Sequence, residues 1–195
     1  MPNSFRRPIF ETNRLRLRPL EPGDEEFLAA LDSDPDVMQY IHTGPLLPRT
    51  ALRWAQSQVE MAPHRRHLHK WIVEAGDHDG NKAGVKIGWI ELGKFRGIFD
   101  PEEARGGDDV SIGYQFGRAY WQQGFASEAV RPILAYAFDT LRLDRVVAFV
   151  HTGNQRSARL LEKLGFRRHA TRRYKDEGGH ECFLYALMQE VLRPK

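Results

Sequence analysis

Apolar and polar residues alternate over several short stretches in the first half of the chain. Residues 14–19 read Arg-Leu-Arg-Leu-Arg-Pro, which has the period of two expected of a strand with one buried face. Two further apolar runs, 71–75 and 85–92, flank the turn-rich segment GDHDGNKAG and predict a pair of antiparallel strands. Helical spacing follows Glu21, with Asp24 at the end that the helix dipole favours for an acidic residue. It recurs over 50–61, where the apolar residues on one face are Leu52, Ala55, Val59 and Ala62. The first half therefore predicts antiparallel strands accompanied by two helices.

In the second half, strands and helices alternate. The pattern predicts strand, helix, strand, helix, strand and strand, in that order, over 110–116, 126–141, 145–150, 154–164, 166–174 and 181–188. The first three of these elements have the combined length of a crossover that joins two parallel strands. We therefore predict one α/β domain over residues 1–195, with a mixed sheet of about six to seven strands flanked by helices.

Composition narrows the class of protein. The 29 basic and 26 acidic residues give a net charge of only +3, which argues against a dedicated nucleic-acid binder. The single cysteine, Cys182, excludes a disulfide framework and a thiolate metal cluster, and its mid-strand position favours ordinary packing. No apolar run approaches the roughly 18 residues of a membrane span. We expect a soluble protein of a reducing compartment, the cytoplasm.

The helix predicted over 126–141 begins in an unusual way, with the sequence Gln-Gln-Gly-Phe-Ala-Ser. Gly124 permits positive φ and a close approach of a ligand, and Ala126 and Ser127 are also small. The free backbone N–H groups of residues 122–127, with the helix dipole behind them, suit a diphosphate. Taken alone, the loop could equally be an ordinary turn, because it matches neither the dinucleotide-binding nor the Walker glycine pattern.

A second motif, HTGNQRSARLLEKLGF, covers residues 151–166. Asn154 is a natural N-cap, and Gly165 is suited to end the helix. Capping alone would explain both residues. The hydroxyl of Ser157 is less typical, because glutamate or glutamine caps better at the third helical position. We expect Ser157 to lie at the same end of the sheet as Gly124.

The stretches IGYQFGRAYWQQGFASEAVRPILAYAF and NQRSARLLEKLGF together resemble the GCN5-related N-acetyltransferase (GNAT) family. They are most similar to the branch that contains the ribosomal-protein alanine N-acetyltransferases, and TNRLRLRPLEPGD resembles the opening strand and helix of that branch. The resemblance covers nearly the whole chain. It implies a GNAT-like sheet in which the two central parallel strands splay apart.

The resemblance also implies acetyl-CoA as the co-substrate. Its pyrophosphate would lie on the loop formed by Gln122, Gln123, Gly124, Phe125, Ala126 and Ser127. Its pantetheine arm would pair with the backbone of Tyr114, Gln115 and Phe116. Asn154 would face the arm near the sulfur, and Ser157 would give a proton to the departing thiolate. The family has arginine or glutamine three residues before the glycine, where this chain has Trp121, so a side-chain contact to the cofactor is in doubt there.

No metal is expected. The stretch HRRHLHK, residues 64–70, contains three histidines, but no carboxylate or cysteine is next to them. We interpret this stretch as a solvent-facing basic loop.

These observations predict direct acetyl transfer from acetyl-CoA to a primary amine, at a protein N-terminus or on a small molecule. The candidates for the general base are Glu91 and Glu177, followed by Asp176, although each could equally be a solvated charge. A longer acyl-CoA could also serve as donor. The alternative function is a catalytically silent GNAT-fold module that binds RNA or a ribosomal partner through its arginine pairs, which the small net charge disfavours. The last two strands could pair across a homodimer.

Overall fold

The computed structural model describes residues 7–41, 43–65, 68–76, 84–94, 109–173 and 180–189. Its α-helices are α1 (Glu25–Ser33), α2 (Pro35–Met38), α3 (Pro48–Met61), α4 (Phe125–Ala135) and α5 (Gln155–Lys163). Shorter helical turns cover Ala62–His64, Arg118–Tyr120 and Tyr136–Thr140. The strands are β1 (Phe10–Glu11), β2 (Leu15–Pro19), β3 (Lys70–Ala75), β4 (Val85–Lys94), β5 (Val110–Phe116), β6 (Arg145–His151), β7 (Arg167–Arg173) and β8 (Glu181–Met188).

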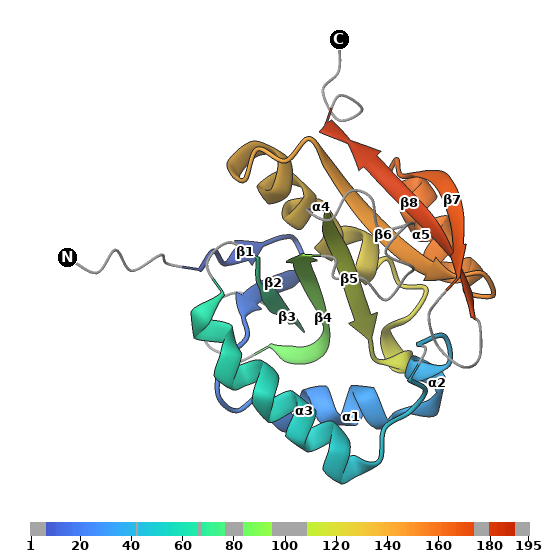
Figure 1. The fold of residues 1–195 in the computed structure, drawn as a ribbon. Coiled ribbons are helices and arrows are strands. Elements are labelled where there is room, and N and C mark those ends of the chain that lie inside the picture. Colours follow the sequence, from blue (N-terminus) through green and yellow to red (C-terminus); the bar gives the residue numbers. More distant parts are fainter. Residues whose placement is uncertain are drawn as a thin grey trace. The chain divides into compact units, whose positions relative to one another are not determined.

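The strands form one mixed sheet in the order β1-β2-β3-β4-β5-β6-β8-β7 (Figure 1). Strands β1 to β4 pair antiparallel, whereas β5 pairs with β6 in parallel, with Ser111 opposite Val147. The predicted mixed sheet with flanking helices is therefore confirmed. Over the described residues it has eight strands rather than six or seven, because the two-residue strand β1 is too short to leave a pattern in the sequence. The predicted splay of β5 and β6 stays a prediction.

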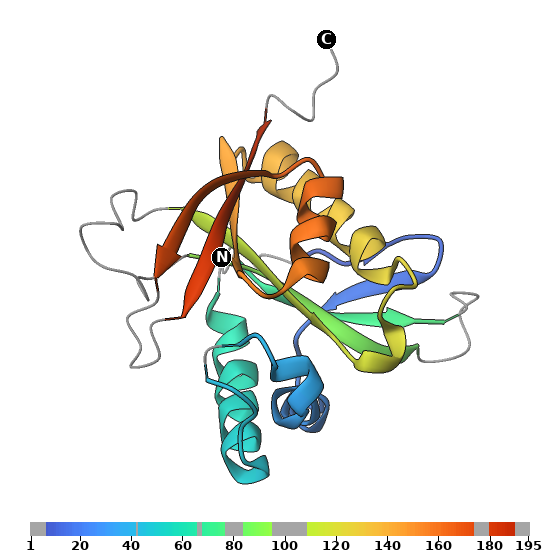
Figure 2. The ribbon, with the colours of Figure 1, turned by 90° about the vertical axis from the view of Figure 1, so that its right-hand side faces the viewer.

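The chain divides into two compact units, so the predicted single domain also stays a prediction. Unit 1 comprises Met1–Gln39, Thr43–Glu91 and Tyr114–Ala129, and unit 2 comprises the remainder. In unit 1, α1 and α3 lie side by side in both views (Figures 1 and 2). They share one core with β3, composed of Leu20, Leu28, Ala29, Ala51, Ala55, Val59, Ala62 and Ile72. Small alanines on α3 allow the two helices to approach closely.

In unit 2, β8 lies between β6 and β7 and pairs antiparallel with both. Leu161 of helix α5 is fully buried, and the Tyr185 hydroxyl on β8 donates a hydrogen bond to the Glu162 carboxylate of α5 at 2.9 Å. As predicted, Cys182 is a fully buried residue within β8. The exposed arginines of β7 lie on the edge strand of the sheet, where charge discourages pairing with other strands.

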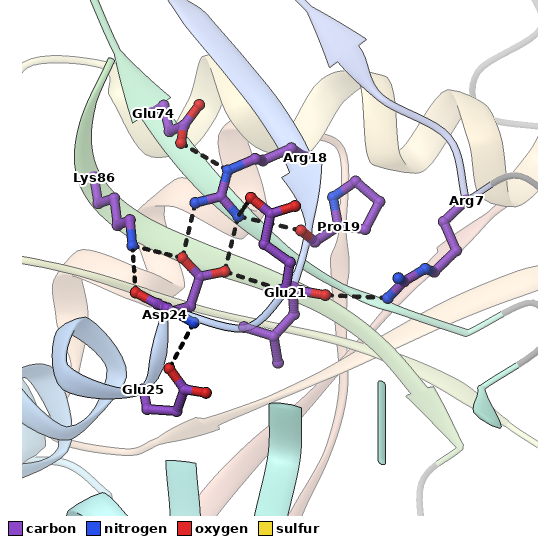
Figure 3. A network of polar contacts seen from close by, with 10 residues as sticks. Arg7, Arg18, Pro19, Glu21, Asp24, Glu25, Glu74 and Lys86 are labelled. Atoms are coloured by element: carbon purple, nitrogen blue, oxygen red, sulfur yellow. Dashed lines mark hydrogen bonds and ion pairs between the residues drawn. The ribbon is translucent and has the colours of Figure 1, made fainter. Parts of the chain in front are cut away.

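A buried charge network fixes the beginning of α1 in unit 1 (Figure 3). The guanidinium of Arg18 on β2 donates to both carboxylate oxygens of Asp24 at 2.8 Å and to Glu74 at 2.7 Å. Lys86 pairs with the same Asp24 carboxylate at 2.6 Å. As predicted, Asp24 lies at the N-terminus of α1, but its side chain makes no cap hydrogen bond and serves this network. The network joins β2, β3, β4 and α1.

Two expectations about surface exposure are wrong. His69 and Lys70 were predicted in a solvent-facing loop, but both are buried at the start of β3. Leu52 was expected on the inner face of α3 and is exposed, while Ala51 takes the buried position one residue earlier. Across the residues that the structure describes, no helix is both long and apolar enough to cross a membrane.

Candidate active site

The loop before α4 is held to β5 by an indole. The Trp121 Nε1–H donates to the carbonyl oxygen of Phe116 at 2.7 Å. The loop then adopts positive φ at Gln122, +61°, and at Gly124, +82°. This conformation is strained for a residue with a Cβ atom, so Gly124 suits the turn and Gln122 must be held in it by its surroundings. Trp121, which stands where the family has arginine or glutamine, therefore anchors the loop to β5.

The backbone N–H groups of this loop lie at the start of a helix. Among the residues that the structure describes, no protein acceptor takes the N–H groups of residues 122–127. Helix α4 begins at Phe125, so its dipole adds positive potential at the same place. The structure thus places all six predicted loop residues at a helix N-terminus with free donors.

The predicted pantetheine strand, residues 114–116 of β5, lies in unit 1 with this loop. The side chain of Gln115 is buried: its amide oxygen accepts a hydrogen bond from Trp89 at 2.9 Å, and its amide nitrogen is 3.1 Å from the sulfur of Met38. Phe116 is also buried. A cofactor contact from Gln115 would therefore use the backbone, as predicted, and the side chain has a packing role.

The start of α5 in unit 2 brings Asn154 and Ser157 together. The side-chain oxygen of Asn154 accepts the Ser157 backbone N–H at 3.1 Å, so the predicted N-cap is confirmed. The predicted C-terminal glycine is confirmed too, because Gly165 has φ +92° and its N–H bonds to Glu162. An unpredicted neighbour is His151, whose Nδ1 accepts the Gly153 N–H at 3.0 Å and whose ring lies 5.4 Å from that of Tyr40.

Glu91, a candidate base, is surrounded by positive charge in unit 1. Its carboxylate pairs with Arg65 and lies 3.4 Å from the ammonium group of Lys70. Burial raises the pKa of Glu91, but the charges of Lys70 and Arg65 and their hydrogen bonds lower it further, so the net pKa lies below the usual value. Burial lowers the pKa of Lys70, in spite of Glu91. The other candidates, Asp176 and Glu177, lie outside the described residues.

The sequence pattern of the Acetyltransferase (GNAT) domain matches residues 14–167. The chain belongs to the GNAT acetyltransferase family. The predicted resemblance and the prediction of an N-acetyltransferase are thereby confirmed.

Similar proteins cover nearly the whole chain. The uncharacterised N-acetyltransferases p20 of Bacillus licheniformis and YoaA of Bacillus subtilis are 29% and 30% identical to it. These matches cover 91% and 93% of this chain, and 94% and 97% of the relatives. The spermidine N(1)-acetyltransferase of Escherichia coli K12 is 25% identical over 92% of this chain and 83% of its own.

Solved structures share the fold. A spermidine N-acetyltransferase from Vibrio cholerae, in complex with CoA and spermine, superposes with a TM-score of 0.73 at 20% identity, covering 92% of this chain and 98% of its own. The ribosomal-protein-S5-alanine acetyltransferase from Vibrio fischeri superposes with a TM-score of 0.69 at 17% identity, covering 96% of this chain and 100% of its own.

Two residues near the loop of this GNAT chain were missed by the sequence reasoning, Arg14 and Glu128. Arg14 precedes β2, and Glu128 is in the first turn of α4. They form an ion pair at 2.7 Å although 114 residues separate them in the chain. A glutamate near a helix N-terminus is already explained by its favourable interaction with the helix dipole. Nothing in the sequence therefore indicated that Glu128 pairs with Arg14.

Proposed function

We propose that this chain transfers the acetyl group of acetyl-CoA directly to a primary amine, of a protein N-terminus or of a small molecule. The observation that carries the proposal is the set of backbone N–H groups over residues 122–127 that have no acceptor among the described residues. In this proposal they bind the two phosphates of the coenzyme, with the dipole of α4 behind them. Membership of the GNAT family supports the same donor.

The pantetheine arm would run along the backbone of residues 114–116, whose N–H groups are suited to polarise the thioester carbonyl. The amine nitrogen attacks the carbonyl carbon, forming a C–N bond as the C–S bond breaks. Ser157 gives its hydroxyl proton to the thiolate of CoA. The proton released by the amine nitrogen restores the hydroxyl, so atoms and charge balance. Holding both reactants in one complex supplies much of the rate.

The proposed mechanism does not depend on Glu91 as the base. A general base works best with a pKa near the working pH, whereas the cations around Glu91 lower its pKa. We infer that Glu91 mainly balances the charge of Lys70, which is buried and lies 3.6 Å above the Trp89 ring. Glu177 stays a candidate base.

The relatives point to amines of two kinds. The names of the Escherichia coli and Vibrio cholerae relatives indicate spermidine, and that of the Vibrio fischeri structure indicates an alanine of ribosomal protein S5. The test is thiol release from acetyl-CoA over a panel of polyamines, alanine-terminated peptides and small amines, together with calorimetry against CoA. We expect release with at least one class. A wild-type protein that fails to bind CoA at millimolar concentration would overturn the proposal.

A further inference from the structure

The N-terminus of α4 is tied to the start of β2 by a single carboxylate. In unit 1, Glu128 Oε1 accepts the Thr12 hydroxyl at 2.6 Å and the Arg14 backbone N–H at 3.0 Å. Its Oε2 accepts Arg14 Nε at 2.7 Å and pairs with Nη2 at 2.7 Å. Four donors thus converge on Glu128, and both of these guanidinium nitrogens meet its Oε2, so the contact is a charge-assisted one of the stronger kind. Burial raises the pKa of Glu128, but these bonds from Thr12 and Arg14 lower it below the usual value.

The same guanidinium contacts three consecutive loop residues. Arg14 Nη1 donates to the Gln123 carbonyl oxygen at 3.1 Å. Its Cζ lies 4.3 Å from the centre of the Phe125 ring, within the range of a cation–π contact. Its Nη2 lies 3.4 Å from the place where a Cβ on Gly124 would be. We call Thr12, Arg14 and Glu128 the clamp.

The clamp determines the direction of the loop's N–H groups. A trans peptide is planar, and its C=O and N–H point to opposite sides. Because Arg14 holds the Gln123 carbonyl, the N–H of Gly124 in the same peptide must point away from the guanidinium. The Gly124 carbonyl in turn accepts the Glu128 N–H at 3.0 Å, which directs the Phe125 N–H outward from the helix.

We propose that Arg14 and Glu128 are positioning residues that set the affinity for the coenzyme's diphosphate by holding this loop in its binding conformation; the inference rests on the function proposed above. Positive φ at Gln122 is costly for a residue with a Cβ atom, so the loop needs contacts that hold it in this conformation. Because Glu128 balances the charge of Arg14, the pair acts through loop geometry rather than through net attraction of the phosphates. Pre-formed donors bind tightly because little order is lost on binding.

Breaking the clamp is therefore expected to weaken donor binding without slowing the chemical step. In Arg14→Gln, the dissociation constant for CoA and the KM for acetyl-CoA should rise roughly tenfold or more, with kcat at saturation nearly unchanged. Arg14→Lys keeps the positive charge but loses the planar guanidinium that donates to Glu128 and Gln123 together. It should therefore show most of the same rise in the dissociation constant and the KM. Arg14→Gln with Glu128→Gln should cost little more than Arg14→Gln alone, because the two residues act as one unit.

The control is Arg16→Gln, which removes the same charge from an exposed position on β2, two residues along the chain. It should bind CoA as the wild type does. Circular dichroism and melting confirm that each variant is folded. Thr12→Val, which removes the hydroxyl's hydrogen bonds to Glu128 and to the Leu15 backbone and leaves Arg14 in place, replaces any variant that is not.

The decisive comparison uses two donors, acetyl-CoA and S-acetyl-pantetheine, which lacks the diphosphate, with an amine that the wild type acetylates. The clamp variants should lose kcat/KM with acetyl-CoA and keep it with S-acetyl-pantetheine. Equal losses with both donors, or unchanged CoA affinity in folded Arg14→Gln, would overturn the inference while leaving the acetyltransferase proposal intact. A wild type that binds no CoA would overturn both.

Discussion

The carboxylate of Glu91 has two cationic partners, and removing it separates a structural role from a catalytic one. In Glu91→Gln, Lys70 stays buried without its counter-charge, so we expect the free energy of unfolding to fall by roughly 2–3 kcal/mol. A general base contributes about 10²- to 10⁴-fold in rate. We expect kcat to change by less than about tenfold, because the lowered pKa of Glu91 opposes that role. Urea unfolding and thiol release measure the two quantities, and a hundredfold fall in kcat would restore Glu91 as a base.

Ser157 is the residue on which the proposed protonation of the thiolate depends. Ser157→Ala should lower kcat about tenfold to a hundredfold and leave the KM for acetyl-CoA nearly unchanged, because the lost hydroxyl acts mainly in the transition state. The Asn154 cap contacts the backbone N–H of residue 157, so it survives the substitution and the fold should be kept. Ser157→Thr, which keeps the hydroxyl, is the matched variant. Thiol-release rates that are the same for serine and alanine would remove Ser157 from the mechanism.

Single residues were predictable from the sequence where their role is local. Asn154 and Gly165 were identified because capping depends on neighbours within one helical turn. The partners of Glu91 and of Arg14 were not, because those contacts join segments that lie far apart in the chain. The role of Trp121 was also missed: the departure from the family pattern was visible, but its hydrogen bond to Phe116 was not.

At the scale of the elements, β4 and β5 approach closely at Gly88. A Cβ at this position would lie 2.4 Å from the Gln115 carbonyl oxygen and 2.6 Å from Phe116 Cδ1. Gly88→Ala must therefore displace residues 115–116, and we expect a loss of about 1–3 kcal/mol of stability together with weaker CoA binding. Gly117→Ala is the control, because its Cβ would only reach ordinary contact with Tyr120 at 3.5 Å. Denaturant unfolding measures the loss of stability, and calorimetry measures the affinity for CoA. Unchanged CoA affinity in Gly88→Ala would show that residues 114–116 of β5 do not bind the coenzyme.

The order of the long elements followed from hydrophobic periodicity, but their ends did not. The helix predicted over 126–141 is α4 up to Ala135, and a π-helical turn continues it over Tyr136–Thr140. Pro132 lies inside α4 and can donate no hydrogen bond to the preceding turn. Helix α2 went unpredicted because four residues carry no measurable period, although Asp34 caps it through two backbone N–H groups. Short elements depend on contacts that a periodic pattern does not record.

At the scale of the whole molecule, acid stability should depend on the network around Arg18. Two cations, Arg18 and Lys86, face the buried carboxylates of Asp24 and Glu74, and the more exposed carboxylate of Glu21 lies 3.3 Å from Arg18. Burial raises the pKa of Asp24, but the hydrogen bonds that its carboxylate accepts from Arg18, from Lys86 and from the Glu21 backbone N–H more than offset this, and the net pKa is lowered. The pKa of Arg18 is raised by its two carboxylates in spite of burial.

The lowered pKa of Asp24 fixes the sign of the pH dependence. A carboxyl whose pKa is lower in the folded state stabilises the protein fully above its unfolded pKa, near 3.8, and this contribution is lost as the pH falls through the lower folded value. Asp24→Asn should therefore cost on the order of 3 kcal/mol at neutral pH, because it leaves Arg18 buried without a full counter-charge. Denaturant unfolding of both proteins should show this difference shrinking below pH 3.8. Asp36→Asn, in an exposed pair with Arg118, should change little at any pH. If the difference in the free energy of unfolding between the wild type and Asp24→Asn does not depend on pH, Asp24 stabilises the protein through packing rather than through its charge.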